Sequence, residues 1–280
     1  MPALPKISII TPSYNQARFL EETILSILNQ NYPNLEYIII DGGSTDESID
    51  IIKRYDKNLS YWISEKDNGQ SYAINKGFEM CTGDILNWLN SDDRLMPNAL
   101  TSLIKAVYAD PDAGAWIGCC NIVDPAGNLL DTNVPRGLIR NKIASWGFEG
   151  HFFQPACFFS RNAWEKYGPL DEELHFCFDF DFYLKVITDY EFVGSGKIWA
   201  EATSHKDAKT EKQPNLLKEE ISLVQRRHGF ERLASPNNFL REGFIYGFLK
   251  PGVLRTMIVR LYKLGLRNYY NARAKLKGMK

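Results

Sequence analysis

The stretch Leu86-Asn87-Trp88-Leu89-Asn90-Ser91-Asp92-Asp93-Arg94-Leu95-Met96-Pro97 joins an apolar run to two adjacent carboxylates. The apolar run predicts a buried strand, and the proline predicts the start of a helix. Two neighbouring anions repel each other and favour solvent, so a chain that places them at a strand end often uses them to hold a cation or to transfer a proton. The simpler alternative is that Asp92 or Asp93 caps the helix.

Strand and helix patterns alternate through the first hundred residues. Strands are expected at residues 7–11, 35–41, 59–64 and 84–89, and helices at 20–30, from Ser44 onward, and at 70–80. Ser44 and Glu47 have the spacing of a capping box. This order predicts a parallel sheet with helices on both faces. Ligands of such sheets bind outside the carboxyl ends of the strands, so we expect Asp41, Asp92 and Asp93 to line one crevice.

The pattern after residue 113 is less regular. Short strands are expected at residues 115–123, 129–132, 156–160 and 190–199, and helices at 161–167, 181–188 and 215–228. We interpret this part as a mixed continuation of the same sheet that carries part of the site for a second substrate. The sequence therefore predicts one α/β domain over residues 1–235, with halves at about 1–110 and 111–235, and a helical tail over 236–280.

Composition excludes several classes of protein. The chain has 280 residues, of which 44% are apolar and 24% charged, with a formal net charge of −1. An ordinary globular protein has these proportions, and a near-zero charge argues against a nucleic-acid partner. The five cysteines form no C-x-x-C pair, which favours reduced thiols in the cytoplasm. The N-terminus has no secretory pattern, and no apolar segment reaches about 18 residues.

The tail differs in composition from the rest of the chain. From Arg241 onward it has ten Lys and Arg residues against one acid, Glu242, with aromatic and aliphatic residues between them. A basic amphipathic helix of this kind suits the anionic inner face of a membrane. A tail helix packed on the domain, with its basic face in solvent, is the alternative. Both interpretations stay open at this point.

Several short motifs follow one another in the predicted strand–helix units. They are Ile9-Ile10-Thr11-Pro12-Ser13-Tyr14-Asn15, Tyr37-Ile38-Ile39-Ile40-Asp41-Gly42-Gly43-Ser44-Thr45-Asp46, Asp67-Asn68-Gly69-Gln70, Ala73-Ile74-Asn75-Lys76-Gly77 and Gly83-Asp84-Ile85. Their order and spacing resemble those of family 2 glycosyltransferases. Asn90-Ser91-Asp92-Asp93 then takes the place of the family's Asp-x-Asp element. Because the first acidic position is Asn90 here, this chain has one carboxylate fewer than the usual pattern.

A second block, with residues 154–159, 168–172 and 179–184, is similar to the acceptor half of the same family. The resemblance covers about residues 6–230. It implies a GT-A (Rossmann-like) fold and an inverting transfer of a sugar from a nucleotide-sugar donor, with a UDP-sugar expected, to an acceptor hydroxyl. It also implies a role in bacterial surface-polysaccharide assembly, with a glycan or lipid-linked acceptor, at the cytoplasmic face of the membrane if the tail binds there.

The resemblance also implies site residues. Those expected at the donor are Pro12, Tyr14, Asn15, Asp41, Asn75, Ser91 and Asp92. Asp92, Asp93 and His205 are the expected ligands of a divalent cation, Mn²⁺ or Mg²⁺, which would stabilise charge on the diphosphate. One of Lys206, Lys209 and Lys212 could reach the phosphates, although a solvated basic loop is the simpler interpretation.

Inverting transfer needs a base that takes the proton of the acceptor. The resemblance gives this role to Asp179, with Asp181 as the second candidate; either could instead cap the helix that follows. A sugar-1-phosphate nucleotidyltransferase would need a glycine-rich basic loop after the first strand, where this chain has Thr11-Pro12-Ser13-Tyr14-Asn15-Gln16. A non-catalytic binding module remains the other alternative, and the retained Asp41, Asp92 and Asp179 argue against it.

Overall fold

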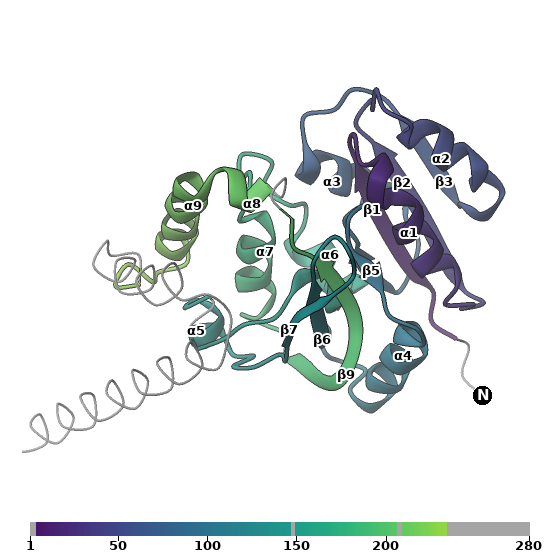
Figure 1. The fold of residues 1–280 in the computed structure, drawn as a ribbon. Coiled ribbons are helices and arrows are strands. Elements are labelled where there is room, and N and C mark those ends of the chain that lie inside the picture. Colours follow the sequence, from purple (N-terminus) through teal and green to yellow (C-terminus); the bar gives the residue numbers. More distant parts are fainter. Residues whose placement is uncertain (1–3, 147–148, 206–208, 234–280) are drawn as a thin grey trace, which may run out of the picture. The chain divides into compact units, whose positions relative to one another are not determined.

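A mixed sheet of nine strands runs through the residues that the computed structural model describes, 4–146, 149–205 and 209–233 (Figure 1). Its main path has the order β3-β2-β1-β4-β8-β6-β9-β5, and β7 pairs with β6. The strands are β1 (Ile7–Ser13), β2 (Leu35–Asp41), β3 (Tyr61–Ser64), β4 (Ile85–Trp88), β5 (Arg94–Leu95), β6 (Ala115–Val123), β7 (Leu129–Asn133), β8 (Cys157–Ser160) and β9 (Phe192–Thr203). The expected α/β class is confirmed.

The two halves of the sheet differ in strand direction. In the first half β1 pairs in parallel with β2 and β4, and β2 pairs in parallel with β3. In the second half β8 is antiparallel to β4 and β6, whereas β6 and β9 are parallel. The carboxyl ends of β1, β2 and β4 therefore meet at one edge, as the strand–helix alternation predicts.

Helices cover both faces of the sheet. They are α1 (Ala17–Leu28), α2 (Ser48–Arg54), α3 (Gln70–Met80), α4 (Ala99–Ala109), α5 (Arg140–Ile143), α6 (Arg161–Tyr167), α7 (Phe178–Val186), α8 (Lys209–Lys212) and α9 (Pro214–Arg227), with 3-10 turns η1 (Asp56–Asn58) and η2 (Gln154–Ala156). Figure 1 shows α1 and α2 beside β1 and β2, and α7, α8 and α9 grouped together on the other side of the molecule.

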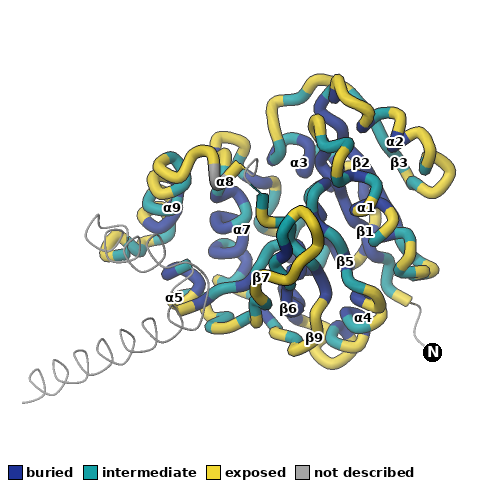
Figure 2. The backbone as a smooth tube through the Cα atoms, in the orientation of Figure 1, coloured by how far each residue is buried: buried dark blue, intermediate teal, exposed yellow. Residues whose placement is uncertain are grey.

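Alternation along the strands divides the core in two. Ile9 and Ile39 pack in one apolar cluster with side chains of α1, α2 and α4, and Ile10 and Ile38 pack in the other with α3 and α7. Successive side chains of a strand point to opposite faces, so a strand that is buried on both faces is apolar throughout. Figure 2 shows the resulting dark-blue strands and the almost wholly buried α7.

Several helices begin at other residues than expected, and two of these differences concern the site. Helix α2 begins at Ser48 and not at Ser44, and its N-cap residue, Glu47, makes no side-chain capping bond. The Ser44 hydroxyl instead donates to Asp41 Oδ1 at 2.6 Å, so the capping-box prediction is wrong. Helix α7 begins at Phe178, ahead of the expected residue 181, which places both Asp179 and Asp181 in its first turn.

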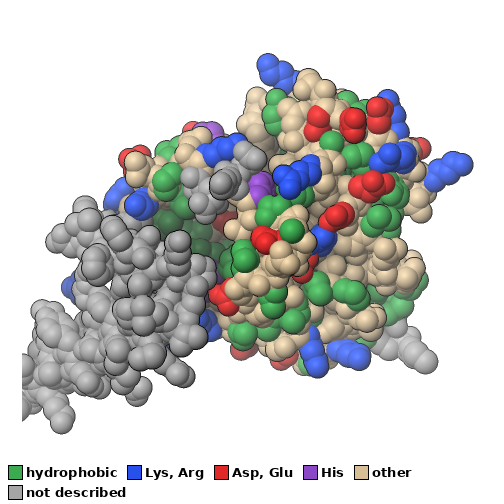
Figure 3. All heavy atoms as spheres, in the orientation of Figure 1, with side chains coloured by type: hydrophobic (Ala, Val, Ile, Leu, Met, Phe, Trp, Pro, Cys, Tyr) green, Lys and Arg blue, Asp and Glu red, His purple; other side chains and the backbone are tan. Residues whose placement is uncertain are grey.

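The described surface carries charges of both signs. On the face shown in Figure 3, the acidic and basic side chains of the described residues lie interspersed. On that face, therefore, no patch of one sign dominates.

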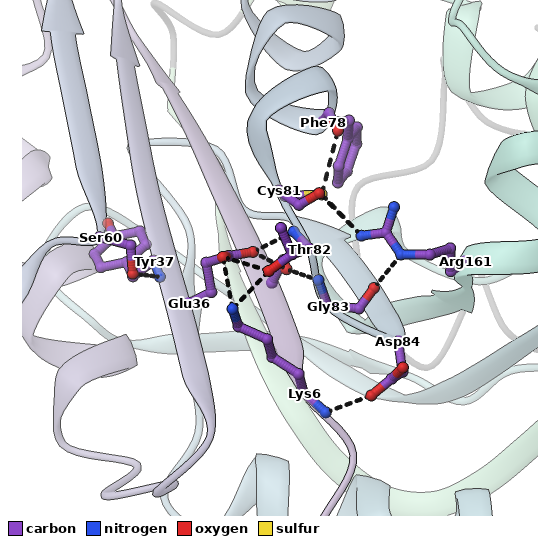
Figure 4. Close-up of polar contacts among 11 residues, drawn as sticks. Lys6, Glu36, Tyr37, Ser60, Phe78, Cys81, Thr82, Gly83, Asp84 and Arg161 are labelled. Carbon is purple, nitrogen blue, oxygen red and sulfur yellow. Dashed lines mark hydrogen bonds and ion pairs between the residues drawn. The ribbon is translucent and has the colours of Figure 1, made fainter.

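A buried carboxylate ties together the amino-terminal ends of the first strands (Figure 4). Glu36 on β2 accepts the hydroxyl of Ser8 on β1 at 2.6 Å and the N–H of Thr82 at 2.6 Å. Its Oε1 also lies 2.9 Å from Lys6 Nζ. Burial alone would raise the pKa of Glu36, but the hydrogen bonds from Ser8, Lys6 and Thr82 lower it to about 2. The charged carboxylate therefore stabilises the folded sheet.

The chain divides into two units, Met1–Leu233 and Ala234–Lys280. The second unit lies outside the described residues, and so does the predicted amphipathic tail, which stays a prediction. Among the described residues, no helix is both long enough and apolar enough to span a membrane.

We predict that Glu36→Gln lowers the free energy of unfolding at pH 7 by about 2 kcal/mol, because an amide cannot replace a carboxylate that accepts several charged hydrogen bonds. The folded-state pKa of about 2 lies below the ordinary value of 4.5, so this stabilisation is full above pH 4.5 and is lost as the pH falls towards 2. Urea unfolding at several pH values measures it. Glu79→Gln, at an exposed position, is the control, and equal losses in the two variants would contradict the prediction.

Candidate active site

A cavity of about 910 Å³ opens at the carboxyl ends of β1 and β4. Its wall combines the turn after β4, the first turn of α7 and the segment after β9, which are far apart in the sequence. The cavity is lined by seven of the residues expected from the sequence, namely Pro12, Tyr14, Ser91, Asp92, Asp93, Asp179 and His205. The other four, Asn15, Asp41, Asn75 and Asp181, are not among its lining residues.

Asp92 and His205 face each other in the cavity. His205 Nε2 lies 3.0 Å from Asp92 Oδ2, and the imidazole packs against Phe19 of α1 with ring centroids 5.1 Å apart. Thr23, also on α1, fixes the backbone of the acidic turn, because its hydroxyl contacts the carbonyl oxygens of Ser91 and Asp93 at 3.0 and 2.7 Å. The structure thus brings together a carboxylate after β4 and a histidine after β9, both expected as cation ligands.

Asp93 has a different environment from Asp92. Its carboxyl oxygens accept the N–H of Thr203 at 3.3 Å and the side-chain amide of Asn90 at 3.1 Å, and the residue is 6% exposed. Burial, and then the charge of Asp92, raise the pKa of Asp93 well above its usual range. The residue that replaces the first acid of the family's element, Asn90, thus holds Asp93 by a hydrogen bond. The geometry favours a structural role for Asp93 over the expected role of cation ligand.

The Asp92–His205 pair suits a divalent cation as a partial ligand set. A carboxylate oxygen and an imidazole nitrogen 3.0 Å apart are compatible donors to Mn²⁺. The described residues contain no group of three or more ligating side chains. The residues present therefore supply two of the ligands that a bound divalent cation would need.

Asp179 lines the cavity, and its carboxyl group is hydrogen-bonded to the backbone. It lies in the first turn of α7, and its Oδ1 accepts the N–H of Phe180 at 2.6 Å. Burial raises the pKa of Asp179 to about 6, and the backbone hydrogen bonds offset only part of that effect. A carboxyl group with this pKa gives up its proton just below neutral pH, which suits a general base.

Asp181 is held in an ion-pair cluster instead. Its Oδ2 lies 2.6 Å from Lys185 Nζ, and its Oδ1 lies 2.9 Å from Nε2 of His228, which follows α9. Burial alone would raise the pKa of Asp181, but His228 and Lys185 lower it below its usual value. The side chain links α7 to the end of α9. This position does not suit the second-candidate base that the resemblance implied.

Asp41 organises a loop and does not face the cavity. The residue is fully buried, and its Oδ2 accepts the N–H groups of Gly43 and Ser44 at 3.1 and 2.9 Å. The hydroxyl of Ser64 donates to the same oxygen at 2.6 Å. Gly43 has a φ of +79°, which favours glycine. The loop presents Gly42 to the cavity, so Asp41 shapes the expected donor side without lining it.

Asn15 and Asn75 are also structural in this arrangement. Asn15, with a left-handed φ of 52°, accepts the N–H of Thr45 at 2.8 Å and so fastens the loop after β1 to the loop after β2. Asn75 on α3 exchanges two hydrogen bonds with the backbone of Leu170, at 3.0 and 2.9 Å. It thereby joins the two halves of the domain. Neither residue lines the cavity, and their expected contacts with the donor stay a prediction.

Several lining residues were missed in the sequence. Asp67 faces Gly42 so closely that a Cβ there would lie 2.9 Å from its carboxylate, and burial raises the pKa of Asp67. Gln154 donates to the carbonyl of Trp88 at 2.6 Å, and its buried Oε1 has no hydrogen-bond partner among the described residues. The buried hydroxyl of Ser13 has none there either. All three occur in the quoted motifs, which could have identified them.

Of the lysines expected near the phosphates, Lys209 lines the cavity, and Lys206 lies outside the described residues.

We predict that the two acids of α7 respond oppositely to amide substitution. Because the folded-state pKa of Asp179 lies above its ordinary value of 3.8, folding becomes less favourable as the pH rises from about 3.8 through 6. Asp179→Asn should therefore raise the free energy of unfolding at pH 7.5 by about 1–2 kcal/mol, and by less at pH 4.5. Asp181→Asn loses an ion pair and should lower it by about 1–2 kcal/mol. Urea unfolding of both variants is the measurement, and destabilisation by Asp179→Asn at pH 7.5 would refute the assignment.

Residues 8–168 match the model of the protein family described as Glycosyl transferase family 2. The chain is 28% identical over 219 residues to the chondroitin synthase of Escherichia coli, which covers 77% of this chain and 31% of that enzyme. The chain therefore spans about a third of that relative.

Two solved structures show the fold. The S. aureus TarS 1-349 structure in complex with UDP-GlcNAc has a TM-score of 0.59 at 16% identity, covering 82% of this chain and 67% of that one. The mannosyltransferase PcManGT from Pyrobaculum calidifontis, in complex with GDP-Man and Mn²⁺, has a TM-score of 0.56 at 18% identity, with coverages of 93% and 81%. The chain belongs to glycosyl transferase family 2 and has the expected GT-A fold.

Proposed function

We propose that this protein transfers a sugar from a nucleotide-sugar donor, with a UDP-sugar as the expected donor, to a hydroxyl of a glycan or lipid-linked acceptor, with inversion at the sugar carbon. One observation carries the proposal. A single cavity contains both the Asp92–His205 pair and the partly buried Asp179 carboxyl with a pKa of about 6.

The Asp92–His205 pair marks the place of the donor diphosphate. These two residues would hold Mn²⁺ or Mg²⁺, which when bound supplies positive charge to the leaving diphosphate. Ser91 and the segment Pro12 to Tyr14 line the same cavity and would contact the base and the ribose of the nucleotide. The Ser13 hydroxyl, buried without a partner among the described residues, is available to a ligand hydroxyl.

Asp179 is the proposed base. The bond from the sugar carbon to the diphosphate oxygen breaks, and its electron pair leaves with the nucleotide. The acceptor oxygen forms the new bond on the opposite face of the sugar, and its proton passes to the carboxylate of Asp179. A carboxylate that is partly removed from water, with a pKa of about 6, is a stronger base than an exposed aspartate and is still ionised at neutral pH.

The comparisons support the substrate classes. The two solved structures are complexes, one with UDP-GlcNAc and the other with GDP-Man and Mn²⁺. They favour a nucleotide-sugar donor and a divalent cation here. A chondroitin synthase among the relatives favours a role in assembling a bacterial surface polysaccharide. Such a role would place the enzyme in the cytoplasm, with the basic tail at the inner face of the membrane.

We predict that one of UDP, GDP and dTDP binds in the presence of Mn²⁺ and at least tenfold more weakly without it, as measured by calorimetry. Asp92→Asn should abolish this difference, because it removes a carboxylate ligand. Asp50→Asn, at an exposed position on α2, is the control and should bind as the wild type does. Failure of the folded wild type to bind any of the three nucleotides would favour the non-catalytic binding module.

We predict that Asp179→Asn lowers turnover by a factor of about 10²–10⁴ without changing nucleotide affinity. Release of UDP from the UDP-sugar measures the rate. In the wild type the rate should rise with pH through about 6, since the base must be ionised. Asp181→Asn, assayed at a temperature at which it is folded, should retain turnover and this pH dependence. Loss of turnover in Asp181→Asn alone would reverse the assignment.

A further inference from the structure

Three consecutive backbone N–H groups converge on one side chain. The N–H of His175 donates to Glu220 Oε1 at 2.9 Å, and those of Phe176 and Cys177 donate to Glu220 Oε2 at 2.8 and 3.0 Å. Glu220 belongs to α9 and is 6% exposed. Charged hydrogen bonds of this kind are among the stronger ones in proteins, and here they act together on a short segment.

The segment from His175 to Cys177 leads directly into the helix of the proposed base. Cys177 is the N-cap residue of α7 and makes no side-chain capping bond, and Asp179 lies in the first turn. His175 and Phe176 line the cavity, whereas Glu220 does not. A carboxylate at a helix N-terminus is favourable, because unpaired N–H groups and the helix dipole are positive there. Glu220 supplies that carboxylate from a different helix.

The same segment is held from its other side. Lys209 of α8 donates to the carbonyl oxygen of His175, and its ammonium lies 5.2 Å from the ring centroid of Phe176. Figure 1 shows α7, α8 and α9 side by side, as these contacts require. The segment is therefore held through both its N–H groups and a carbonyl.

We propose that Glu220 is a positioning residue for Asp179. This inference rests on the proposed function, in which Asp179 must meet the acceptor hydroxyl at hydrogen-bond distance. A displacement of about 1 Å in a reacting group can cost roughly 100-fold in rate. Glu220 sets the backbone position from which α7, and with it Asp179, starts. Its effect should fall on the chemical step and not on the binding of the donor.

The substitution Glu220→Gln keeps the shape of the side chain and removes one of the two oxygens that accept the N–H groups of His175, Phe176 and Cys177. Glutamine has one acceptor oxygen. Its NH₂ group can only donate, so it would lie against backbone N–H groups that it cannot accept. Glu219→Gln makes the same chemical change at the next residue, which is exposed, and serves as the matched control. Glu220→Asp keeps the charge on a shorter side chain. It is the milder variant if Glu220→Gln does not fold.

The first experiment measures amide hydrogen exchange in the full chain and requires no activity. Glu220→Gln should speed exchange of the amides of His175, Phe176 and Cys177 at least tenfold, and Glu219→Gln should leave it unchanged. Unchanged protection of these amides in a folded Glu220→Gln would overturn the inference, since Glu220 would not then hold the segment.

The second experiment measures turnover. Glu220→Gln should lower kcat about 10- to 100-fold, with the donor KM and the nucleotide affinity within threefold of the wild type, and Glu220→Asp should recover part of the loss. A wild-type kcat in Glu220→Gln, with Asp179→Asn inactive, would overturn the positioning role. A change confined to the donor KM would also overturn it.

The two proposals fail in different ways. If the wild type transfers no sugar, the proposed function fails, and the positioning role that rests on it fails too. The exchange experiment still decides whether Glu220 fixes the segment before α7. If the wild type is active and Glu220→Gln matches it, only the inference about Glu220 fails.

Discussion

The hydrogen bonds to the buried carboxyl group of Asp41 are the interaction on which one wall of the cavity depends. Burying a polar group is costly unless it is hydrogen-bonded, and the oxygens of Asp41 accept hydrogen bonds from the loop that follows β2 and from Ser64 at the end of β3. Those bonds determine the path of Gly42 and Gly43. Ser44, fixed in this way, accepts the N–H of Asn15 at 2.8 Å, so the loop after β1 is fixed in turn.

Neighbouring acids in this chain have unlike roles, and their difference arises from distant residues. Asp92 meets His205, whereas Asp93 is held by Asn90 and Thr203. The local pattern contains Asn90 and predicts that acids lie at the end of the strand, but it does not contain Thr203, at the end of β9, or His205, which follows β9. For that reason the strand end was predictable, and the division of labour between the two carboxylates was not.

In the fold, too, features set by neighbouring residues were predictable, and features set by distant residues were not. Alternating strands and helices predicted the sheet because apolar runs and helical periodicity are local properties. The start of α2 was predicted wrongly, since Ser44 and Glu47 fit a capping box in the sequence. In the structure the Ser44 oxygen accepts the N–H of Asn15 and its hydroxyl donates to Asp41. Glu220 gave no signal, because an acid beside another acid in a polar helix is typical of a solvent-exposed face. Only the folded chain shows that it is buried.

Two requirements oppose each other at the start of helix α7: its N–H groups need acceptors, and the proposed base, Asp179, needs a raised pKa. The N-terminus of the helix needs an acceptor for unpaired N–H groups, and an aspartate in the first turn would ordinarily supply one, at the cost of a lowered pKa. Asp179 accepts one of these groups, the N–H of Phe180, and burial nevertheless raises its pKa to about 6. Glu220 accepts the N–H groups that precede the helix from outside the cavity. Because a carboxylate on α9 accepts the N–H groups that precede α7, Asp179 does not have to accept them and can serve as the proposed base.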